Sequence, residues 1–261
     1  MILQEIAENT RKRLEKIKEE VPLKEVQAKA QGMNANTGFP FKKALKAPGM
    51  SFICEVKKAS PSKGVIAETF PYLEIAKEYQ EAGASSISVL TEPDYFQGSP
   101  RYLQEISQMV SIPTLRKDFV VDVYQIYEAK LLGASAVLLI SELLTEAQLK
   151  EYLEVSWKLG LSALTEAHSE AQVEKALKAG ADILGVNNRN LENFQVDMET
   201  SVRLRKLVPP ETVFVSESGI RTREDIMPLE EAGVDGVLIG ETFMRSPDKK
   251  AMLAQLKGQN G

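Results

Sequence analysis

The chain has 261 residues, of which 43% are hydrophobic and 26% are charged. This composition is ordinary for a globular protein with a buried core, and it excludes an intrinsically disordered chain. The formal net charge of -5 gives no general attraction for nucleic acid or anionic lipid, and no apolar segment approaches the roughly 20 residues that span a bilayer.

The first predicted element is a helix over residues 2–20, where apolar residues recur on one thin stripe among many charges. Residues 21–50 contain prolines and glycines with weak periodicity, which indicates a connection before regular structure begins. We expect residues 1–50 to form an N-terminal helical extension and residues 51–261 to form the main domain.

From residue 51 onward, short apolar runs alternate with helical patterns. Eight such runs lie at residues 52–56, 87–90, 113–115, 136–140, 161–164, 183–186, 213–215 and 236–239. Alternating strands and helices predict a parallel sheet with helices outside it. The number of strands and the length of the chain fit a single α/β domain, a (β/α)₈ TIM barrel.

Four of the predicted strands follow related phrases, EAGASSISVL, LLGASAVLLI, KAGADILGV and EAGVDGVLIG. Each phrase ends a helix on a glycine, namely Gly83, Gly133, Gly180 or Gly233, and glycine readily takes the left-handed conformation that stops helices. The phrase recurs before every second strand. That period suits a closed barrel with interior layers from alternate strands better than an open doubly wound sheet.

In a barrel of this type the active site lies at the C-terminal ends of the strands, so polar residues that close the apolar runs are the candidates. The first run leads into EVKKASPSKG, where Glu55 and Lys57 are two residues apart and project to the same side. An ordinary solvated ion pair is the alternative interpretation. Ser60 lies in the following loop, whose hydroxyl groups and glycine suit an anion.

The third run ends in LRKDF, which crowds two cations at one strand end. By alternation Arg116 and Lys117 face opposite sides of the strand. Lysine is the better proton donor of the two, because its pKa shifts readily when it is desolvated or lies near another cation. We therefore expect Lys117 to face the pocket and to act as the catalytic acid.

The fifth and seventh runs each close on a carboxylate, Glu166 in TEAH and Glu217 in FVSESG. Glutamates seldom follow buried strands without partners, which favours a functional pair, although Glu166 could instead form a salt bridge to a neighbouring loop. The sixth run leads into GVNNRNL, where Asn187 and Arg189 are two residues apart and both could reach inward.

Other polar residues are expected to be structural. Asn188 and Asn190 suit turn formation, and His168 is expected to be an ordinary loop histidine. Since Cys54 is the only cysteine and His168 the only histidine, we expect no disulfide, no metal site and no Ser/His/Asp triad. The N-terminus lacks the basic region and apolar run of a signal peptide, so we expect a cytoplasmic protein.

The last two runs are followed by ESGI and IGETFM, which place Ser218, Gly219, Gly240 and Glu241 at adjacent strand ends. Barrels often bind phosphate between these two loops, through backbone N–H groups and the N-terminus of a short helix. We expect a local phosphate site here, with the carboxylate of Glu241 turned away from it.

Together these motifs resemble the indole-3-glycerol phosphate synthase family. The resemblance runs nearly end to end and is carried by EVKKASPSKG, LTEPDYFQGS, LRKDF, the TEAH glutamate, GVNNRNL, FVSESGI and LIGETFMR. It implies a monofunctional lyase of tryptophan biosynthesis that needs no cofactor or metal. The implied reaction closes a ring on 1-(2-carboxyphenylamino)-1-deoxy-D-ribulose 5-phosphate, then removes carbon dioxide and water to give indole-3-glycerol phosphate.

The resemblance, together with the residue-level reasoning above, gives a set of expected site residues. Lys117 is the expected general acid and Glu166 its acid/base partner. Catalytic roles are expected for Lys117, Glu166, Lys57, Glu55, Asn187 and Glu217. Substrate contacts are expected for Ser60, Phe96, Phe119, Leu138, Arg189, Leu191, Ser218 and Ile239. Phosphate contacts are expected for Lys57, Ser60, Gly219, Gly240 and Glu241.

The resemblance further implies that the N-terminal helix packs over the barrel mouth and helps to cover the substrate. We expect a monomer that acts on a small phosphorylated molecule, with no nucleic-acid or membrane partner. Two other interpretations stay open. A class I aldolase would use Lys117 or Lys57 to form a Schiff base with a sugar-phosphate ketone. A non-catalytic barrel would use the same motifs only to bind a metabolite or a partner subunit.

Overall fold

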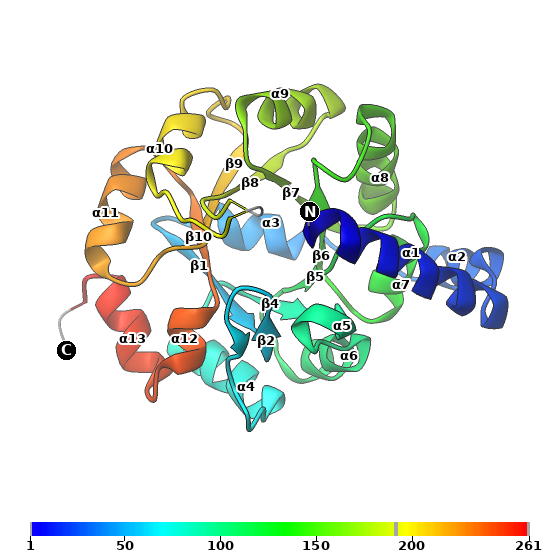
Figure 1. The fold of residues 1–261 in the computed structure, drawn as a ribbon, viewed down its shortest axis with the longest axis horizontal. Helices are drawn as coiled ribbons and strands as arrows, with labels where there is room; N and C mark the ends of the chain where they lie inside the picture. Colours follow the sequence, from blue (N-terminus) through cyan, green and yellow to red (C-terminus); the bar gives the residue numbers. More distant parts are fainter. Residues whose placement is uncertain (1, 191–192, 260–261) are drawn as a thin grey trace.

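A computed structural model describes residues 2–190 and 193–259, and its centre is a closed barrel of parallel strands (Figure 1). The strands are β1 (Ser51–Val56), β4 (Ser86–Leu90), β5 (Thr114–Lys117), β6 (Ala136–Ile140), β7 (Ser162–Ala167), β8 (Ile183–Asn187), β9 (Val213–Glu217) and β10 (Gly236–Ile239). Each strand pairs with its neighbours along the chain, and β1 closes the ring against β10. The predicted TIM barrel is confirmed.

Helices cover the outside of the barrel. They are α4 (Tyr72–Ala82), α5 (Pro93–Phe96), α6 (Pro100–Met109), α7 (Tyr124–Leu131), α8 (Glu146–Lys158), α9 (Glu170–Ala179), α10 (Glu199–Arg205), α11 (Arg223–Glu231), α12 (Glu241–Arg245) and α13 (Lys249–Leu256). A short antiparallel hairpin, β2 (Ala59–Ser60) with β3 (Gly64–Val65), follows β1. Among the described residues, no helix has the length and apolar character needed to cross a membrane.

The four glycines of the repeated phrase end helices as predicted. Gly83, Gly133, Gly180 and Gly233 have φ angles of 90°, 82°, 97° and 75°. These angles lie in the left-handed region that side chains disfavour, so each glycine can stop its helix and turn the chain directly into the next strand.

Four strands extend past the C-terminal ends of the predicted apolar runs. β5 continues to Lys117, β7 to Ala167, β8 to Asn187 and β9 to Glu217. The apolar runs stop short of the polar residues that close them, but the backbone ladder includes those residues, since Lys117 pairs with Leu90 and Glu217 pairs with Asn187. The candidate side chains are therefore fixed by the sheet itself, which holds them more rigidly than a loop would.

Residues 21–50 are more than a connection, so that prediction was wrong. They contain α2 (Leu23–Gln31), which packs on α7, and α3 (Pro40–Leu45). Phe41 and Leu45 lie on one face of α3 and join the apolar core inside the barrel, where Leu45 contacts the start of β10. Helices of nine and six residues are too short to show a clear apolar period, which is why the sequence pattern concealed them.

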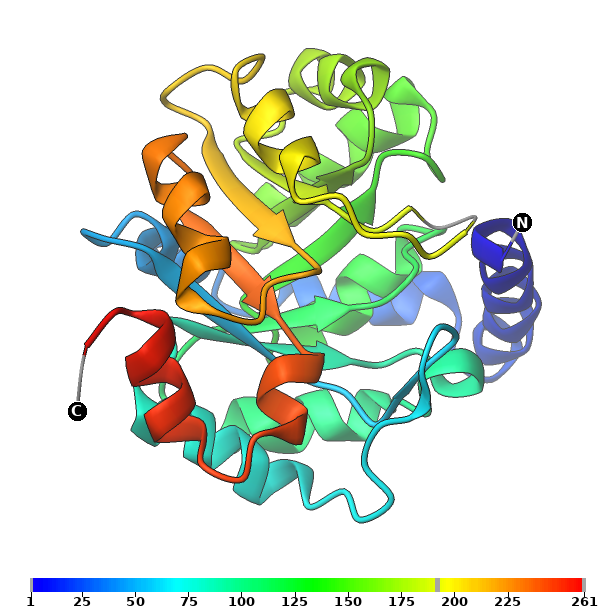
Figure 2. The ribbon, with the colours of Figure 1, turned by 60° about the vertical axis from the view of Figure 1, so that its left-hand side comes forward.

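The first helix, α1 (Ile2–Glu20), lies at the opposite end of the barrel, toward which the strand arrows point (Figure 2). Its residues Ile2, Leu3 and Ile6 line the cavity at the C-terminal ends of the strands. The segment before β1 therefore supplies a helix to each end of the barrel.

Candidate active site

A cavity of about 390 Å³ opens at the C-terminal ends of the strands, under α1. Every predicted site residue that the structure describes lines it, namely Glu55, Lys57, Ser60, Phe96, Lys117, Phe119, Leu138, Glu166, Asn187, Arg189, Glu217, Ser218, Gly219, Ile239, Gly240 and Glu241. Leu191 lies outside the described residues. The barrel thus brings together side chains from seven of its strands and the loops that follow them.

Lys117 occupies the centre of the cavity, between two carboxylates. Its Nζ lies 3.1 Å from Oε2 of Glu166 on β7 and 3.5 Å from Oε2 of Glu217 on β9. These side chains, with Glu55 of β1, come from alternate strands and so form one inward-facing layer. All four are largely buried, which makes the charge pairing strong and the geometry fixed.

Electrostatic interactions between the charged groups of this layer set their protonation states. Burial alone would lower the pKa of Lys117, but Glu166, Glu217 and Glu55 outweigh burial and raise it above the ordinary lysine value. The sequence argument had favoured an easily lowered lysine pKa, and the surrounding carboxylates reverse that expectation. Lys117 therefore carries its proton before substrate arrives.

The two glutamates beside Lys117 differ. Burial would raise the pKa of Glu166, but Lys117 and His168 outweigh it and lower the pKa to about 2. At Glu217, burial and the negative charges of Glu166 and Glu55 all raise the pKa. Together they outweigh the lowering effect of Lys117 and bring the pKa of Glu217 to about 8. At neutral pH Glu166 is a carboxylate while Glu217 retains a proton, so the pair provides one base and one acid.

Lys57 and Glu55 form an ion pair at the end of β1. The Lys57 ammonium and the Glu55 carboxylate also lie close to the backbone of Gly240. A Cβ atom at residue 240 would collide with both. The absence of a side chain at residue 240 therefore leaves room for the strand-one pair beside the last strand end.

Asn187, the last residue of β8, contacts the charged inward-facing layer. Asn187 Nδ2 donates to Oε1 of Glu166 at 3.3 Å, and its Oδ1 accepts from the backbone N–H of Arg189 at 3.0 Å. The guanidinium of Arg189 donates to the Phe194 carbonyl at 3.2 Å. Arg189 thus borders the cavity while one of its donors holds its own loop.

The predicted phosphate loops follow the neighbouring strands β9 and β10 and both line the cavity. Ser218 and Gly219 both have left-handed backbone, with φ of 68° and 92°. The carboxylate of Glu241 pairs with Arg245 at 3.1 Å and with Lys63 at 3.6 Å. Two cations therefore hold the Glu241 carboxylate, which limits its repulsion of an anion.

Apolar side chains form one wall of the cavity. The rings of Phe96 and Phe119 are 5.9 Å apart and tilted by 40°, an arrangement that suits a further aromatic ring alongside. Leu138 and Ile239 also line the cavity and are almost fully buried. The cavity therefore combines a charged layer with a surface for an aromatic group.

Known proteins resemble this chain over its whole length. A family model described as indole-3-glycerol phosphate synthase matches residues 3–256. The chain is 55% identical over 258 residues to the indole-3-glycerol phosphate synthase of Ruminiclostridium cellulolyticum, with 99% of each chain covered. It is 50% identical over 268 residues to the protein of that name from Lachnoclostridium phytofermentans, with 98% of this chain and 99% of that one covered. The chain belongs to the indole-3-glycerol phosphate synthase family.

Solved structures with little sequence identity share only the fold with this member of the indole-3-glycerol phosphate synthase family. The 3-hexulose-6-phosphate synthase from Salmonella typhimurium matches with a TM-score of 0.66 at 12% identity, covering 80% of this chain and 97% of that one. A thiamine phosphate pyrophosphorylase from Pyrococcus furiosus matches with a TM-score of 0.59 at 18% identity, covering 80% and 94%. Both matches are consistent with the barrel architecture.

Sequence reasoning missed the position of His168 in this indole-3-glycerol phosphate synthase family member. The histidine was expected to be an ordinary loop residue, yet its Nε2 lies 3.3 Å from Oε1 of Glu166. Only its position two residues after Glu166, on the same side of an extended chain, could have suggested this contact. His168 helps to keep Glu166 ionised.

Asn188 is also more than a turn residue. It is 3% exposed, and its Nδ2 donates to Ser216 Oγ at 3.0 Å and to the Ser218 carbonyl at 3.1 Å. Its Oδ1 accepts from Ser201. Asn188 therefore ties β8, β9 and α10 together beneath the loops of the site. The turn interpretation fits Asn190, whose side chain accepts from the backbone of Asn193.

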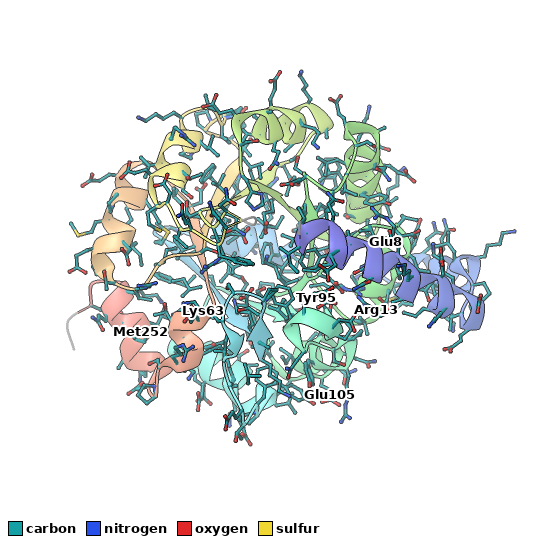
Figure 3. The ribbon with its side chains drawn as sticks, in the orientation of Figure 1. Glu8, Arg13, Lys63, Tyr95, Glu105 and Met252 are labelled. Atoms are coloured by element: carbon teal, nitrogen blue, oxygen red, sulfur yellow. The ribbon has the colours of Figure 1, made fainter. Side chains whose placement is uncertain are left out.

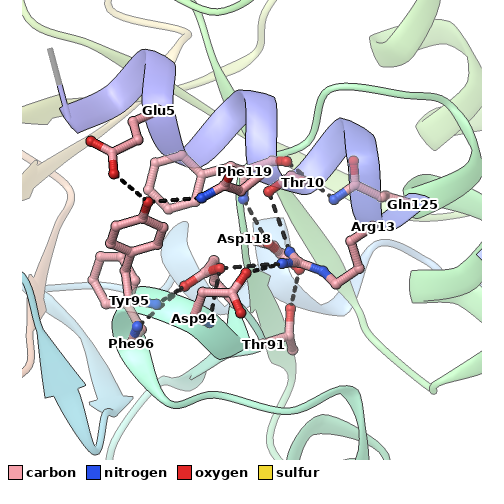
Figure 4. A network of polar contacts seen from close by, with 12 residues as sticks. Glu5, Thr10, Arg13, Thr91, Asp94, Tyr95, Phe96, Asp118, Phe119 and Gln125 are labelled. Atoms are coloured by element: carbon pink, nitrogen blue, oxygen red, sulfur yellow. Dashed lines mark hydrogen bonds and ion pairs between the residues drawn. The ribbon is translucent and has the colours of Figure 1, made fainter. Parts of the chain in front are cut away.

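The covering helix α1 is fastened to the barrel by a polar network (Figures 3 and 4). Arg13 lies 2.6 Å from Asp94 and 3.5 Å from Glu92, a fully buried residue that accepts backbone N–H groups of α5. The hydroxyl of Tyr95 donates to Glu5 at 2.8 Å and accepts from Asn9 at 2.8 Å. These contacts hold α1 over the cavity and fix α5, which carries Phe96.

Removing Arg13 should weaken substrate binding in this indole-3-glycerol phosphate synthase family member. We expect Arg13→Ala to raise KM about fivefold with little change in kcat, since the partly exposed ion pairs of Arg13 with Asp94 and Glu92 contribute about 1 kcal/mol to holding α1. Steady-state kinetics would measure both constants. Lys12→Ala is the matched control, because Lys12 pairs with Glu8 on the same helix and with no other described residue. Equal KM values for the two variants would contradict an anchoring role for Arg13.

Proposed function

We propose that this chain converts 1-(2-carboxyphenylamino)-1-deoxy-D-ribulose 5-phosphate to indole-3-glycerol phosphate, with release of carbon dioxide and water. The observation that carries the proposal is Lys117, held protonated between Glu166 and Glu217 in a cavity that also has an aromatic wall. Family membership and identities of 50% or more over nearly the whole chain support the same reaction.

Ring closure requires an activated ketone. In this proposal Lys117 donates its proton to the ketone oxygen as the ring carbon that carries the carboxylate attacks the carbonyl carbon. The carbonyl oxygen becomes a hydroxyl group, and a carbon–carbon bond forms. Loss of carbon dioxide then returns the electron pair to the ring and restores its aromaticity. General acid catalysis of this kind contributes about 10²–10⁴-fold.

Lys57 orients the substrate for that attack. Its ammonium, paired with Glu55 at the end of β1, is positioned to bind an anionic end of the substrate and hold the molecule in the bent shape that ring closure needs. The ring of the substrate lies against Phe96 and Phe119.

Dehydration completes the indole. One proton must leave the substrate, and the hydroxyl group must gain a proton to depart as water. Glu166 is ionised and suits the first task, while Asn187 and Lys117 hold its two oxygens in place. Glu217, which retains its proton at neutral pH, and the two lysines are the available acids for the second task.

The phosphate end binds between the loops that follow β9 and β10. Ser218, Gly219 and Gly240 offer backbone N–H groups, and Ser60 on the hairpin after β1 adds a hydroxyl group. We further propose a monomer, in which one chain supplies every side chain assigned to the substrate.

The direct test incubates the purified protein with the carboxyphenylamino substrate and follows the appearance of indole absorbance or fluorescence. We expect turnover without added metal or cofactor. A lack of product at high protein concentration would contradict the proposal and favour a binding role for the barrel.

A Schiff-base aldolase is less well supported. An amine must be neutral to attack a carbonyl group, and the three carboxylates near Lys117 raise its pKa instead of lowering it. Borohydride reduction in the presence of the substrate should leave the protein unmodified. A covalent adduct on Lys117 or Lys57 would support the aldolase instead.

A further inference from the structure

Gly185 faces the interior of the barrel at the level of the catalytic layer. It lies on β8 between Ile183, which belongs to the interior core, and Asn187, which contacts Glu166. Alternation along the strand puts these three residues on one face. In the sheet, Gly185 pairs with Glu166 on one side and with Val215 on the other.

The space that a side chain at residue 185 would fill is occupied by Glu217. A Cβ atom there would lie well inside 3.0 Å of Glu217 Oε1, a separation that real Cβ atoms essentially never show. It would also meet Leu164 Cδ1 at 3.2 Å. Glycine in a strand marks a close approach, and here the approaching group is a carboxylate from the neighbouring strand.

This arrangement lets Glu217 be buried inside the barrel. Its Oε1 lies beside Gly185, the residue is 1% exposed, and its Oε2 lies 3.5 Å from Lys117 Nζ. Strand β8 lies between β7 and β9, so a side chain at residue 185 would stand between the two glutamates that flank the lysine. Leu164 Cδ1 also lies 3.2 Å from the position of that Cβ atom, so little free space remains beside Gly185.

We propose that Gly185 is a positioning residue for Glu217. The absence of a side chain at residue 185 lets the Glu217 carboxyl group lie close to Lys117, so that the lysine is held between the carboxyl groups of Glu166 and Glu217. The consequence for turnover rests on the proposed function, whereas the seating of Glu217 does not.

A second strand glycine provides a matched control. Gly236 lies on β10 at the opposite end of the barrel, and the atoms nearest to a Cβ atom there belong to Leu45 and Ser51, at 3.3 Å. Gly236→Ala therefore introduces the same methyl group into a buried strand without touching the catalytic layer.

The experiment compares Gly185→Ala, Gly236→Ala, Glu217→Asp and the double variant Gly185→Ala/Glu217→Asp. We expect Gly185→Ala to lower kcat about 100-fold, as loss of a well-oriented catalytic group does, and Gly236→Ala to stay within about twofold of the parent. The shorter aspartate relieves the collision, so the double variant should exceed the kcat predicted by multiplying the two single effects.

The same four variants are unfolded in urea, which gives a readout independent of turnover. We expect Gly185→Ala to cost less stability in the Glu217→Asp background than in the parent, because the collision is smaller there. Equal costs in both backgrounds, or a Gly185→Ala variant with parental kcat, would overturn the positioning role. If the parent makes no product but the stability coupling is present, the proposed function fails and the seating of Glu217 stands.

Discussion

Replacing Lys117 by methionine should lower kcat by about 10²–10⁴-fold, the usual contribution of a general acid. The variant removes the ammonium that lies between Glu166 and Glu217 while keeping most of the volume of the side chain. KM should change less than kcat, because the phosphate loops and the aromatic wall stay intact. Steady-state assays of indole formation would measure both constants.

Lys42→Met is the matched control for that measurement. Lys42 forms an equally direct lysine–carboxylate pair, with its Nζ 2.5 Å from Asp182, but it lies on α3, whose buried side chains face the opposite end of the barrel. We expect its kcat to match that of the parent. A Lys117→Met protein with parental turnover would remove Lys117 from the chemistry and leave the lysine a structural role only.

Replacing Glu217 by glutamine should make the protein more stable above neutral pH. Glu217 has a pKa of about 8 in the folded protein, against an ordinary value of 4.5. Between these values the folded protein binds a proton that the unfolded chain lacks, so the contribution of Glu217 to stability falls as pH rises. Glutamine cannot ionise and escapes that loss. We expect a gain on the order of 2–4 kcal/mol at pH 8 and a much smaller gain at pH 5.

Urea unfolding of both proteins at pH 5 and pH 8 would measure the gain. Glu105→Gln is the control, because Glu105 lies on α6 away from the cavity (Figure 3) and its pKa is lowered by Tyr72 and Arg101. That substitution should give no gain that grows with pH. If Glu217→Gln shows the same difference from the parent at both pH values, the carboxyl group does not hold a proton at neutral pH. Such a gain would mean that Glu217 lowers the stability of the folded protein, as residues kept for activity often do.

The sequence predicts the barrel because two of its patterns are local. Glycine caps such as Gly83 and Gly180 and the apolar runs that follow them depend on a few adjacent residues, so the alternation of helix and strand is visible without any tertiary information. The site could be located by the same means, since the barrel topology brings all strand ends to one mouth.

Other features depend on contacts between distant residues and could not be predicted in this way. The raised pKa of Lys117 comes from three carboxylates on three other strands. The contact between His168 and Glu166 depends on how β7 ends, and the burial of Asn188 depends on Ser201 of α10 and Ser216 of β9. Gly185 carries no local signal, because its importance comes from a side chain on the next strand.

The N-terminal segment covers both ends of the barrel. Its first helix, α1, covers the mouth where substrate enters, and α3 closes the far end with Phe41 and Leu45. A chain that began at Leu23 would lack α1 and keep α3. The cavity at the C-terminal ends of the strands would then be uncovered, while the other end of the barrel stayed closed. The cover of the mouth and the closure of the far end therefore come from two separate helices of the same segment.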